Sequence, residues 1–221
     1  MYKDFVKFST SRGVSSNTLH DYHKTLNSII SPTIVEERQL NAVTMDVFSR
    51  LMMDRIIILG TEIDSDVSNI ITSQLLYLNS IDYGQDIKMF INSPGGEIYS
   101  GLAIYDVMNF VSPDVSTYVI GIAASMASIL LSSGKKGKRY SLPHSKVLIH
   151  QPMGGLPGGT QESDFKIAYE EIRKCKETLY DILSENTGQE YATIENDADR
   201  DHWFTAVEAM EYGIIDEVIK K

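Results

Sequence analysis

A serine stands among small residues where an apolar, strand-like run gives way to a helical one. Ser125 follows residues 115–120, which read as a strand, and precedes residues 126–131, which read as a helix. Such a turn directs a hydroxyl outward and leaves unpaired backbone N–H groups beside it, and a nucleophile needs both. Because serine is also a favoured helix cap, an N-cap role for Ser125 is the simpler alternative on local sequence alone.

A histidine could act as the base for this serine. His150 ends the short apolar run 146–149 and precedes a turn rich in Pro and Gly. A strand end holds a side chain rigidly beside solvent, and imidazole can take a proton from a hydroxyl near neutral pH. The alternative is a core histidine bonded to the backbone. The other four histidines lie in polar or turn segments, so we expect His150 to be the base.

An acidic run near the C-terminus could supply a carboxylate that orients the imidazole. Its members are Glu195, Asp197, Asp199 and Asp201. A charge run is usually a solvated face, and we interpret the first three acids in this way. Asp201 differs because Trp203 and Phe204 follow it, which indicates a segment that turns into the core.

A turn with adjacent glycines follows another apolar run. Residues 87–91 read as a strand, residues 92–96 spell Asn-Ser-Pro-Gly-Gly, and a helical stretch begins at 98. Adjacent glycines let backbone N–H groups approach a substrate closely, as an oxyanion hole requires. A phosphate-binding loop is the rival interpretation, but the chain contains no G-x-x-x-x-G-K-[ST] sequence.

Bulk composition bounds the function. The 221 residues are 43% hydrophobic and suffice for one substantial core, and the net charge of −10 argues against nucleic acid or an anionic membrane as partner. A single cysteine, Cys175, fits a reducing compartment. The sequence shows no secretory signal and no apolar stretch long enough to span a bilayer. We therefore expect a cytoplasmic protein, without a metal site.

Strands and helices alternate along the chain, which predicts an α/β fold. Besides the runs above, residues 55–59 read as a strand, and residues 65–78, 98–111 and 162–187 read as helices. The last of these has an apolar seam spaced at three and four residues, formed by Phe165, Ala168, Ile172, Cys175, Leu179 and Ile182. The seam could dock on the chain's own core, but charged faces around it favour a projecting helix that pairs with another subunit.

These motifs together resemble the proteolytic subunits of the caseinolytic (Clp) protease family. Matching segments run in family order from about residue 32 to the C-terminus, among them Asn-Ser-Pro-Gly-Gly at 92–96, Ala-Ala-Ser-Met at 123–126, Ile-His-Gln-Pro at 149–152 and Asp-Arg-Asp at 199–201. The resemblance makes Ser125 the nucleophile, His150 the general base and Asp201 the orienting carboxylate. It places the oxyanion donors on the backbone N–H groups of Gly96 and Met126.

The resemblance also implies a fold, an assembly and partners. The fold would be the ββα spiral shared with the crotonases, with residues 162–187 as a handle helix through which two seven-membered rings stack. Unfolded proteins would be the substrates, an AAA+ unfoldase would dock in a groove containing Phe90, Phe110 and Tyr140, and the chain itself would need no cofactor. For these aromatic residues an ordinary core position is the alternative. Residues 32–221 would form one peptidase domain, and residues 1–31 would be a propeptide or a disordered tail.

Two other functions compete with a serine endopeptidase. A crotonase-like acyl-CoA enzyme would use the same fold and paired N–H groups on a thioester oxygen, and a reactive serine separates the two. A ring subunit without activity would carry a broken triad. The intact set Ser125, His150 and Asp201 favours the endopeptidase.

Overall fold

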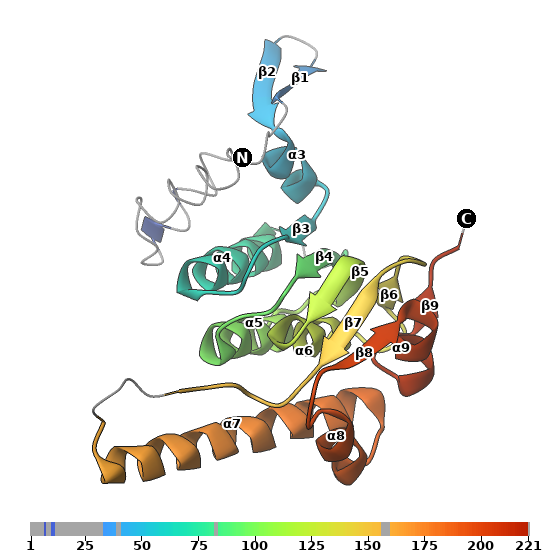
Figure 1. The fold of residues 1–221 in the computed structure, drawn as a ribbon. Helices are drawn as coiled ribbons and strands as arrows, with labels where there is room; N and C mark the ends of the chain where they lie inside the picture. Colours follow the sequence, from blue (N-terminus) through green and yellow to red (C-terminus); the bar gives the residue numbers. More distant parts are fainter. Residues whose placement is uncertain are drawn as a thin grey trace.

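The computed structural model describes residues 7, 10–11, 33–38, 41–81, 84–155 and 160–220. It forms a layered α/β body from which a hairpin and the end of one long helix project (Figure 1). The predicted α/β fold is confirmed. The sequence prediction of a propeptide or disordered tail over 1–31 concerns residues that lie almost wholly outside the described ranges.

The main sheet has seven strands, most of them parallel. Strands β3, β4, β5, β6 and β9 are neighbours in that order, while β7 pairs with β5 and β8 pairs antiparallel with β7. A separate hairpin pairs β1 with β2. The strand bounds are β1 Thr33–Arg38, β2 Asn41–Asp46, β3 Ile56–Leu59, β4 Ile87–Ser93, β5 Val115–Ala124, β6 Arg139–Ser141, β7 Lys146–Ile149, β8 His202–Thr205 and β9 Glu217–Val218.

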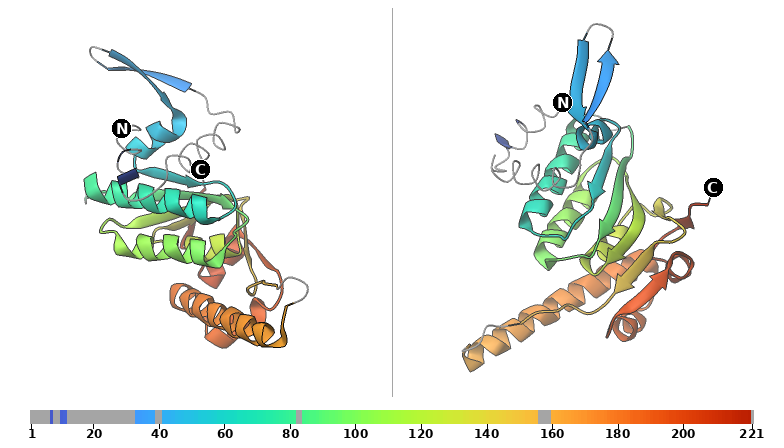
Figure 2. Two further views of the ribbon diagram at one scale, coloured as in Figure 1. Left: turned by 90° about the vertical axis from the view of Figure 1, so that its left-hand side faces the viewer. Right: turned by 45° about the horizontal axis from the view of Figure 1, so that its top comes forward.

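Helices α4, α5 and α6 lie along one face of this sheet (Figures 1 and 2). The β4 strand shows why: Ile87, Met89 and Ile91 point to the helices and are fully buried, whereas Phe90 on the opposite face is half-buried. The helix bounds are α3 Val47–Met53, α4 Ser65–Ile81, α5 Ile98–Phe110, α6 Met126–Ser132, α7 Glu162–Thr187, α8 Tyr191–Asp197 and α9 Ala206–Tyr212.

Strand β5 is longer than the sequence predicted, ending at Ala124 rather than at residue 120. Gly121 would be expected to end a strand, and it does take a left-handed φ of 89°. Side chains satisfy the backbone there: Gly121 N–H donates to Ser145 Oγ at 3.1 Å, and Ile122 N–H donates to Asn92 Oδ1 at 3.2 Å. The strand therefore continues past the glycine and changes partner from β6 to β7.

The long helix α7 has the predicted bounds and divides into two halves. In its C-terminal half Cys175, Leu179 and Ile182 are buried in the chain's own body, as the simpler interpretation of the seam expected. Its N-terminal part projects beyond the body, where Phe165 is 56% exposed (Figure 1). The C-terminal half thus docks on the chain's own core and the N-terminal part projects, while pairing of that part with another subunit stays a prediction.

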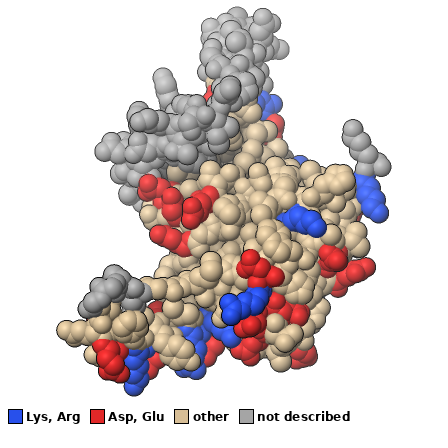
Figure 3. Space-filling view, viewed as in Figure 1, with Lys and Arg blue, Asp and Glu red and all other residues tan. Residues whose placement is uncertain are grey.

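The surface is acidic in keeping with the net charge. On the face shown in Figure 3, the described Asp and Glu side chains gather in clusters, and Lys and Arg are scattered among them. Within the described ranges, none of the helices combines the length and apolarity needed to cross a membrane.

Candidate active site

Ser125 occupies a strained turn between β5 and α6. Its φ of 55° and ψ of −126° are unusual for a residue with a side chain, and such strain costs on the order of 1–3 kcal/mol and gathers at functional sites. The backbone holds the turn: Ser125 N–H donates to Leu148 O at 3.0 Å, and Ser125 O accepts from Ser128 N–H at 2.9 Å. The side chain makes no capping bond. The N-cap interpretation therefore does not describe this serine.

The pairing of β5 with β7 brings the serine to the histidine. Ala124 lies opposite Leu148 in the parallel ladder, so Ser125 follows one residue, and His150 two residues, after the last pair. Both line one cavity of about 90 Å³, which we call the serine cavity. Its walls are Gly96, Ile98, Met126, Ser128, Ile129, Ile149, Gln151, Pro152, Met153, Leu179, Tyr180 and Leu183.

His150 is half-buried, and its Nδ1 lies 2.6 Å from Gln151 O. A carbonyl oxygen only accepts hydrogen bonds, so Nδ1 donates in this contact, and in the neutral ring Nε2 then holds the lone pair. This is the tautomer that a general base for Ser125 requires.

The register of β7 and β8 indicates a position for Asp201 near His150. In the antiparallel β7–β8 ladder, Ile149 lies opposite His202, and the next pair beyond the ladder is His150 with Asp201. The Asp201 side chain is exposed, and among the described residues no hydrogen bond joins it to the imidazole. The orienting role of Asp201 therefore remains a prediction, supported by this register.

The other acids of the run have partners of their own. Glu195 forms an ion pair with Lys176, in which Oε1 and Nζ are 2.7 Å apart. Asp197 Oδ2 accepts a hydrogen bond from the Tyr212 hydroxyl at 3.0 Å. Glu195 is nevertheless 51% exposed, as the solvated-face interpretation expects, whereas Asp197 is half-buried.

A contact that the sequence did not predict holds the segment before Asp201. Gln151 Nε2 donates to Asp199 O at 2.5 Å and approaches Asp199 Oδ1 at 3.3 Å. Phe204 is buried at 3% exposure, as predicted, but Trp203 points outward and is 49% exposed. The alternation of side chains along β8 explains the difference.

The glycine turn packs against the serine turn. A Cβ on Gly95, whose φ is 92°, would come within 2.5 Å of Ala124 O and 2.7 Å of Ser125 Cβ. Ile63 N–H donates to Gly95 O, and Ile63 O accepts from Glu97 N–H. The Gly96 N–H therefore points to the opposite side of the backbone. Met126 is the first residue of α6, so its N–H has no acceptor within the helix. Both residues line the serine cavity, and their role as oxyanion donors stays a prediction.

The other walls of the cavity are mostly apolar, apart from Ser128, Gln151 and one buried phenol. Tyr180 is 1% exposed, and burial raises its pKa to about 12. The phenol is therefore neutral at pH 7 and does not compete with His150 as a base.

Two of the three predicted groove residues come together on the sheet face away from α4 and α5. Phe90 stacks on Tyr118 and Tyr118 on Tyr140, each pair with ring centroids 4.7 Å apart. We call these three residues the aromatic row. Tyr118 was missed because its role depends on the order of β4, β5 and β6. Phe110 is 73% exposed at the end of α5 and has no ring contact with the row within the described chain.

A serine on a strained turn, an imidazole in the base tautomer and backbone donors at one cavity define an acyl-transfer hydrolase. The comparisons specify the family. The Clp protease family model matches residues 38–221. The chain is 54% identical over 219 residues to the ATP-dependent Clp protease proteolytic subunit of Porphyromonas gingivalis, which covers 99% of this chain and 98% of that protein.

Two further relatives carry the same name. The protein of Bacteroides fragilis is 54% identical and that of Bacteroides thetaiotaomicron 52%, each over 99% of both chains. The chain belongs to the Clp protease family, as its motifs predicted. It is accordingly a serine endopeptidase.

Proposed function

We propose that this chain hydrolyses peptide bonds of unfolded proteins through an acyl-enzyme formed on Ser125. His150 Nε2 accepts the hydroxyl proton as Ser125 attacks the carbonyl carbon, and the protonated imidazole then gives that proton to the leaving amine. Water repeats the sequence on the ester and restores the serine. Asp201 stabilises the protonated imidazole, and the N–H groups of Gly96 and Met126 bind the oxyanion.

The observation that carries this proposal is the Ser125 turn. Its backbone is held by three bonds while its hydroxyl makes no capping bond and lines the cavity that His150 also lines. A serine kept at positive φ without a structural use for its hydroxyl fits a nucleophile. The apolar walls fit an extended peptide with an apolar side chain. The scheme uses side chains and backbone only, and we propose no cofactor and no metal.

The assembly and partners are proposed from the family and from exposed features. The projecting half of α7 supports stacking of two rings, each of seven subunits. An AAA+ ATPase partner is proposed because the chain lacks a Walker A sequence with which it could use ATP for unfolding. The aromatic row is proposed as the place where this ATPase docks. The relatives are named as ATP-dependent, which agrees with such a partner. Nucleic acid and membranes are not expected partners.

Processing and location complete the proposal. Residues 32–221 would form the peptidase domain and residues 1–31 a removable propeptide. A cytoplasmic location is proposed from the lone cysteine, Cys175, which is a free thiol.

The test is a serine-directed fluorophosphonate probe with peptide hydrolysis measured alongside. Wild-type protein should be labelled and Ser125→Ala should be neither labelled nor active, a rate loss of roughly 10⁴-fold or more. Ser112→Ala, at an exposed serine that does not line the serine cavity, is the control and should keep labelling. Labelling of Ser125→Ala on another serine would refute the nucleophile. Turnover of acyl-CoA thioesters by that variant would favour the crotonase-like alternative.

A further inference from the structure

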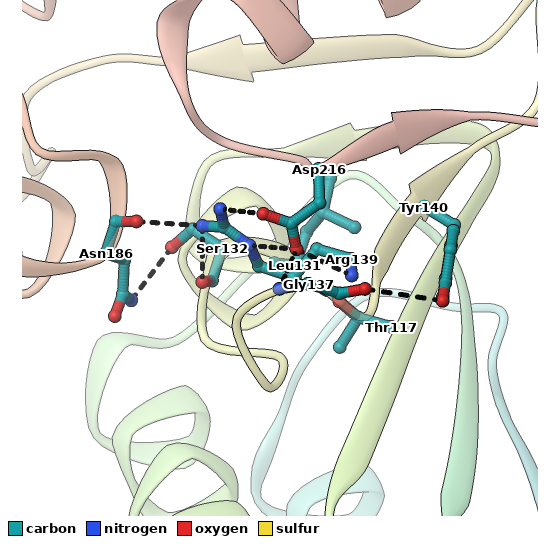
Figure 4. Close-up of polar contacts among 8 residues, drawn as sticks. All are labelled: Thr117, Leu131, Ser132, Gly137, Arg139, Tyr140, Asn186 and Asp216. Atoms are coloured by element: carbon teal, nitrogen blue, oxygen red, sulfur yellow. Dashed lines mark hydrogen bonds and ion pairs between the residues drawn. The ribbon is translucent and has the colours of Figure 1, made fainter.

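A buried arginine far from the serine cavity holds the ends of two helices that build it. Arg139, in β6, has a side chain that is 4% exposed. Its Nε donates to Asp216 Oδ2 at 2.9 Å and its Nη2 to Asp216 Oδ1 at 2.6 Å, a two-point ion pair. The remaining nitrogen, Nη1, turns away from this carboxylate toward the helices (Figure 4).

Nη1 binds one carbonyl at the C-terminal end of each helix. It donates to Ser132 O of α6 at 3.3 Å and to Asn186 O of α7 at 2.8 Å. The last carbonyls of a helix lack partners within it and form the negative end of its dipole, so a cation is favoured there. One buried guanidinium therefore caps two helices at once. We call this set the Arg139 node.

The Asn186 side chain also links the ends of α6 and α7 by hydrogen bonds. Asn186 Nδ2 donates to Ser132 Oγ at 3.1 Å and to Ser133 Oγ at 3.0 Å. Asp216 in turn accepts from the backbone N–H groups of Gly137 at 2.7 Å and Arg139 at 3.0 Å. The node is thus fixed to the loop before β6 and to the segment before β9, and the helix ends are fixed to the node.

Both helices contribute walls to the serine cavity. Helix α6 begins directly after Ser125, and its seven residues span about 10 Å, so it acts as a short rigid rod between the node and the serine turn. Helix α7 supplies Leu179, Tyr180 and Leu183 to the facing wall. A shift of either C-terminal end would therefore change the separation between the serine turn and the wall opposite it.

We propose that Arg139 is a positioning residue for peptide hydrolysis, which sets the register of α6 against α7 and thereby the place of Ser125 and the Met126 N–H. This inference rests on the proposed function. Catalytic geometry is sensitive to such shifts, since a misplacement of 1 Å can cost about 10²-fold in rate.

Three variants separate positioning from simple stabilisation. Arg139→Lys keeps a charge beside Asp216, but an ammonium cannot bind a carboxylate at two points and two helix ends in the fixed directions of a guanidinium. Arg139→Met with Asp216→Asn removes both buried charges, while the amide oxygen still accepts from the Gly137 N–H. Asp216→Asn alone is the matched control, because it weakens the ion pair and leaves the guanidinium within reach of both carbonyls.

The measurements are kcat and KM of a short peptide, with active sites counted by fluorophosphonate labelling, and the melting temperature. We expect kcat per labelled site to fall about 10²-fold in both Arg139 variants, with KM changed less than about threefold. Asp216→Asn should lose stability but keep kcat per labelled site.

An unchanged kcat per site in the Arg139 variants would overturn the inference. So would an equal loss in Asp216→Asn, or failure of both Arg139 variants to fold, because each outcome leaves only a structural role. Ser125→Ala assayed in parallel tests the proposed function separately: if it stays active the nucleophile is wrong, whereas Arg139 is judged from the ratio of its variants to wild type.

Discussion

His150 and Asp201 are the residues that come next on each chain segment after Ile149 and His202, the last pair of the β7–β8 ladder. Asp199 comes two residues before Asp201, outside β8, and Gln151 binds its backbone carbonyl. This position supports Asp201 over the other acids of the run, and its orienting role stays a prediction because its carboxylate is exposed and has no hydrogen bond to the imidazole among the described residues.

This register predicts different results for two similar substitutions. Asp201→Asn should lower kcat by orders of magnitude, about 10⁴-fold where the carboxylate orients the imidazole as in other triads. Asp199→Asn should change kcat little, because the short contact from Gln151 is to the Asp199 carbonyl oxygen, which remains. Steady-state kinetics on one peptide compares the two variants directly. The opposite ranking would show that Asp199 is the orienting acid.

The glycine turn gives a second prediction. Gly95→Ala places a Cβ against Ala124 O and Ser125 Cβ at a φ of 92°, so the serine turn must move. We expect kcat/KM to fall about 10²-fold or more. Gly155→Ala is the control, since a Cβ there has open space and should leave kcat/KM unchanged. Normal activity of Gly95→Ala would mean that the turn tolerates displacement.

The local parts of this site could be predicted from sequence. The bounds of α6 and α7 and the position of Ser125 follow from apolar periodicity and from the small residues at the turn, which are short-range signals. The end of β5 was misjudged because side chains of Asn92 and Ser145, far away in sequence, satisfy the backbone at Gly121 and Ile122.

What sequence could not predict depends on which strands are neighbours. Tyr118 belongs to the aromatic row only because β5 lies between β4 and β6. Arg139 gave no functional signal for the same reason, since its partners are 7, 47 and 77 residues away along the chain. Long-range pairing is the information that a single sequence does not display.

The Asp216 carboxyl group predicts an acid-dependent loss of stability. Burial alone would raise its pKa, but the hydrogen bonds from Arg139 and Gly137 outweigh burial and hold the pKa below its usual value. A lowered native pKa contributes stability that is present above the unfolded value of about 3.9 and is lost as pH falls through the native pKa.

Urea unfolding of wild type and Asp216→Asn tests this sign. At pH 7 the variant should be less stable by about 2 kcal/mol, the scale of hydrogen bonds to a charged group. The difference should shrink as pH falls below about 4. A difference that stays constant over that range would show that the carboxylate charge is not responsible.

The exposed end of α7 predicts how the rings assemble. Phe165→Glu places a charge where we propose that two rings meet, and burying an unpaired charge is unfavourable. Native mass measurement should show the wild type as fourteen subunits and the variant as half that mass. Thr178→Glu, on an exposed face of the same helix beside the body, should keep the full mass. A variant that retains the full mass would exclude this end of α7 from the contact.

The aromatic row predicts where an ATPase partner binds. Tyr118 stacks between two other rings, so Tyr118→Ala removes the centre of the row, and truncation of such an anchor typically costs about 2 kcal/mol or more of binding. Degradation of a stably folded protein with a cognate ATPase and ATP should fall about 30-fold at subsaturating ATPase, while hydrolysis of a short peptide by the free particle serves as the internal control and stays unchanged.

Tyr140→Ala should behave similarly. Phe110→Ala completes the series: Phe110 makes no ring contact with the row within the described chain, so if this variant also uncouples degradation we infer that a second copy supplies Phe110 to the dock. Full coupling in Tyr118→Ala would remove the row from the docking site.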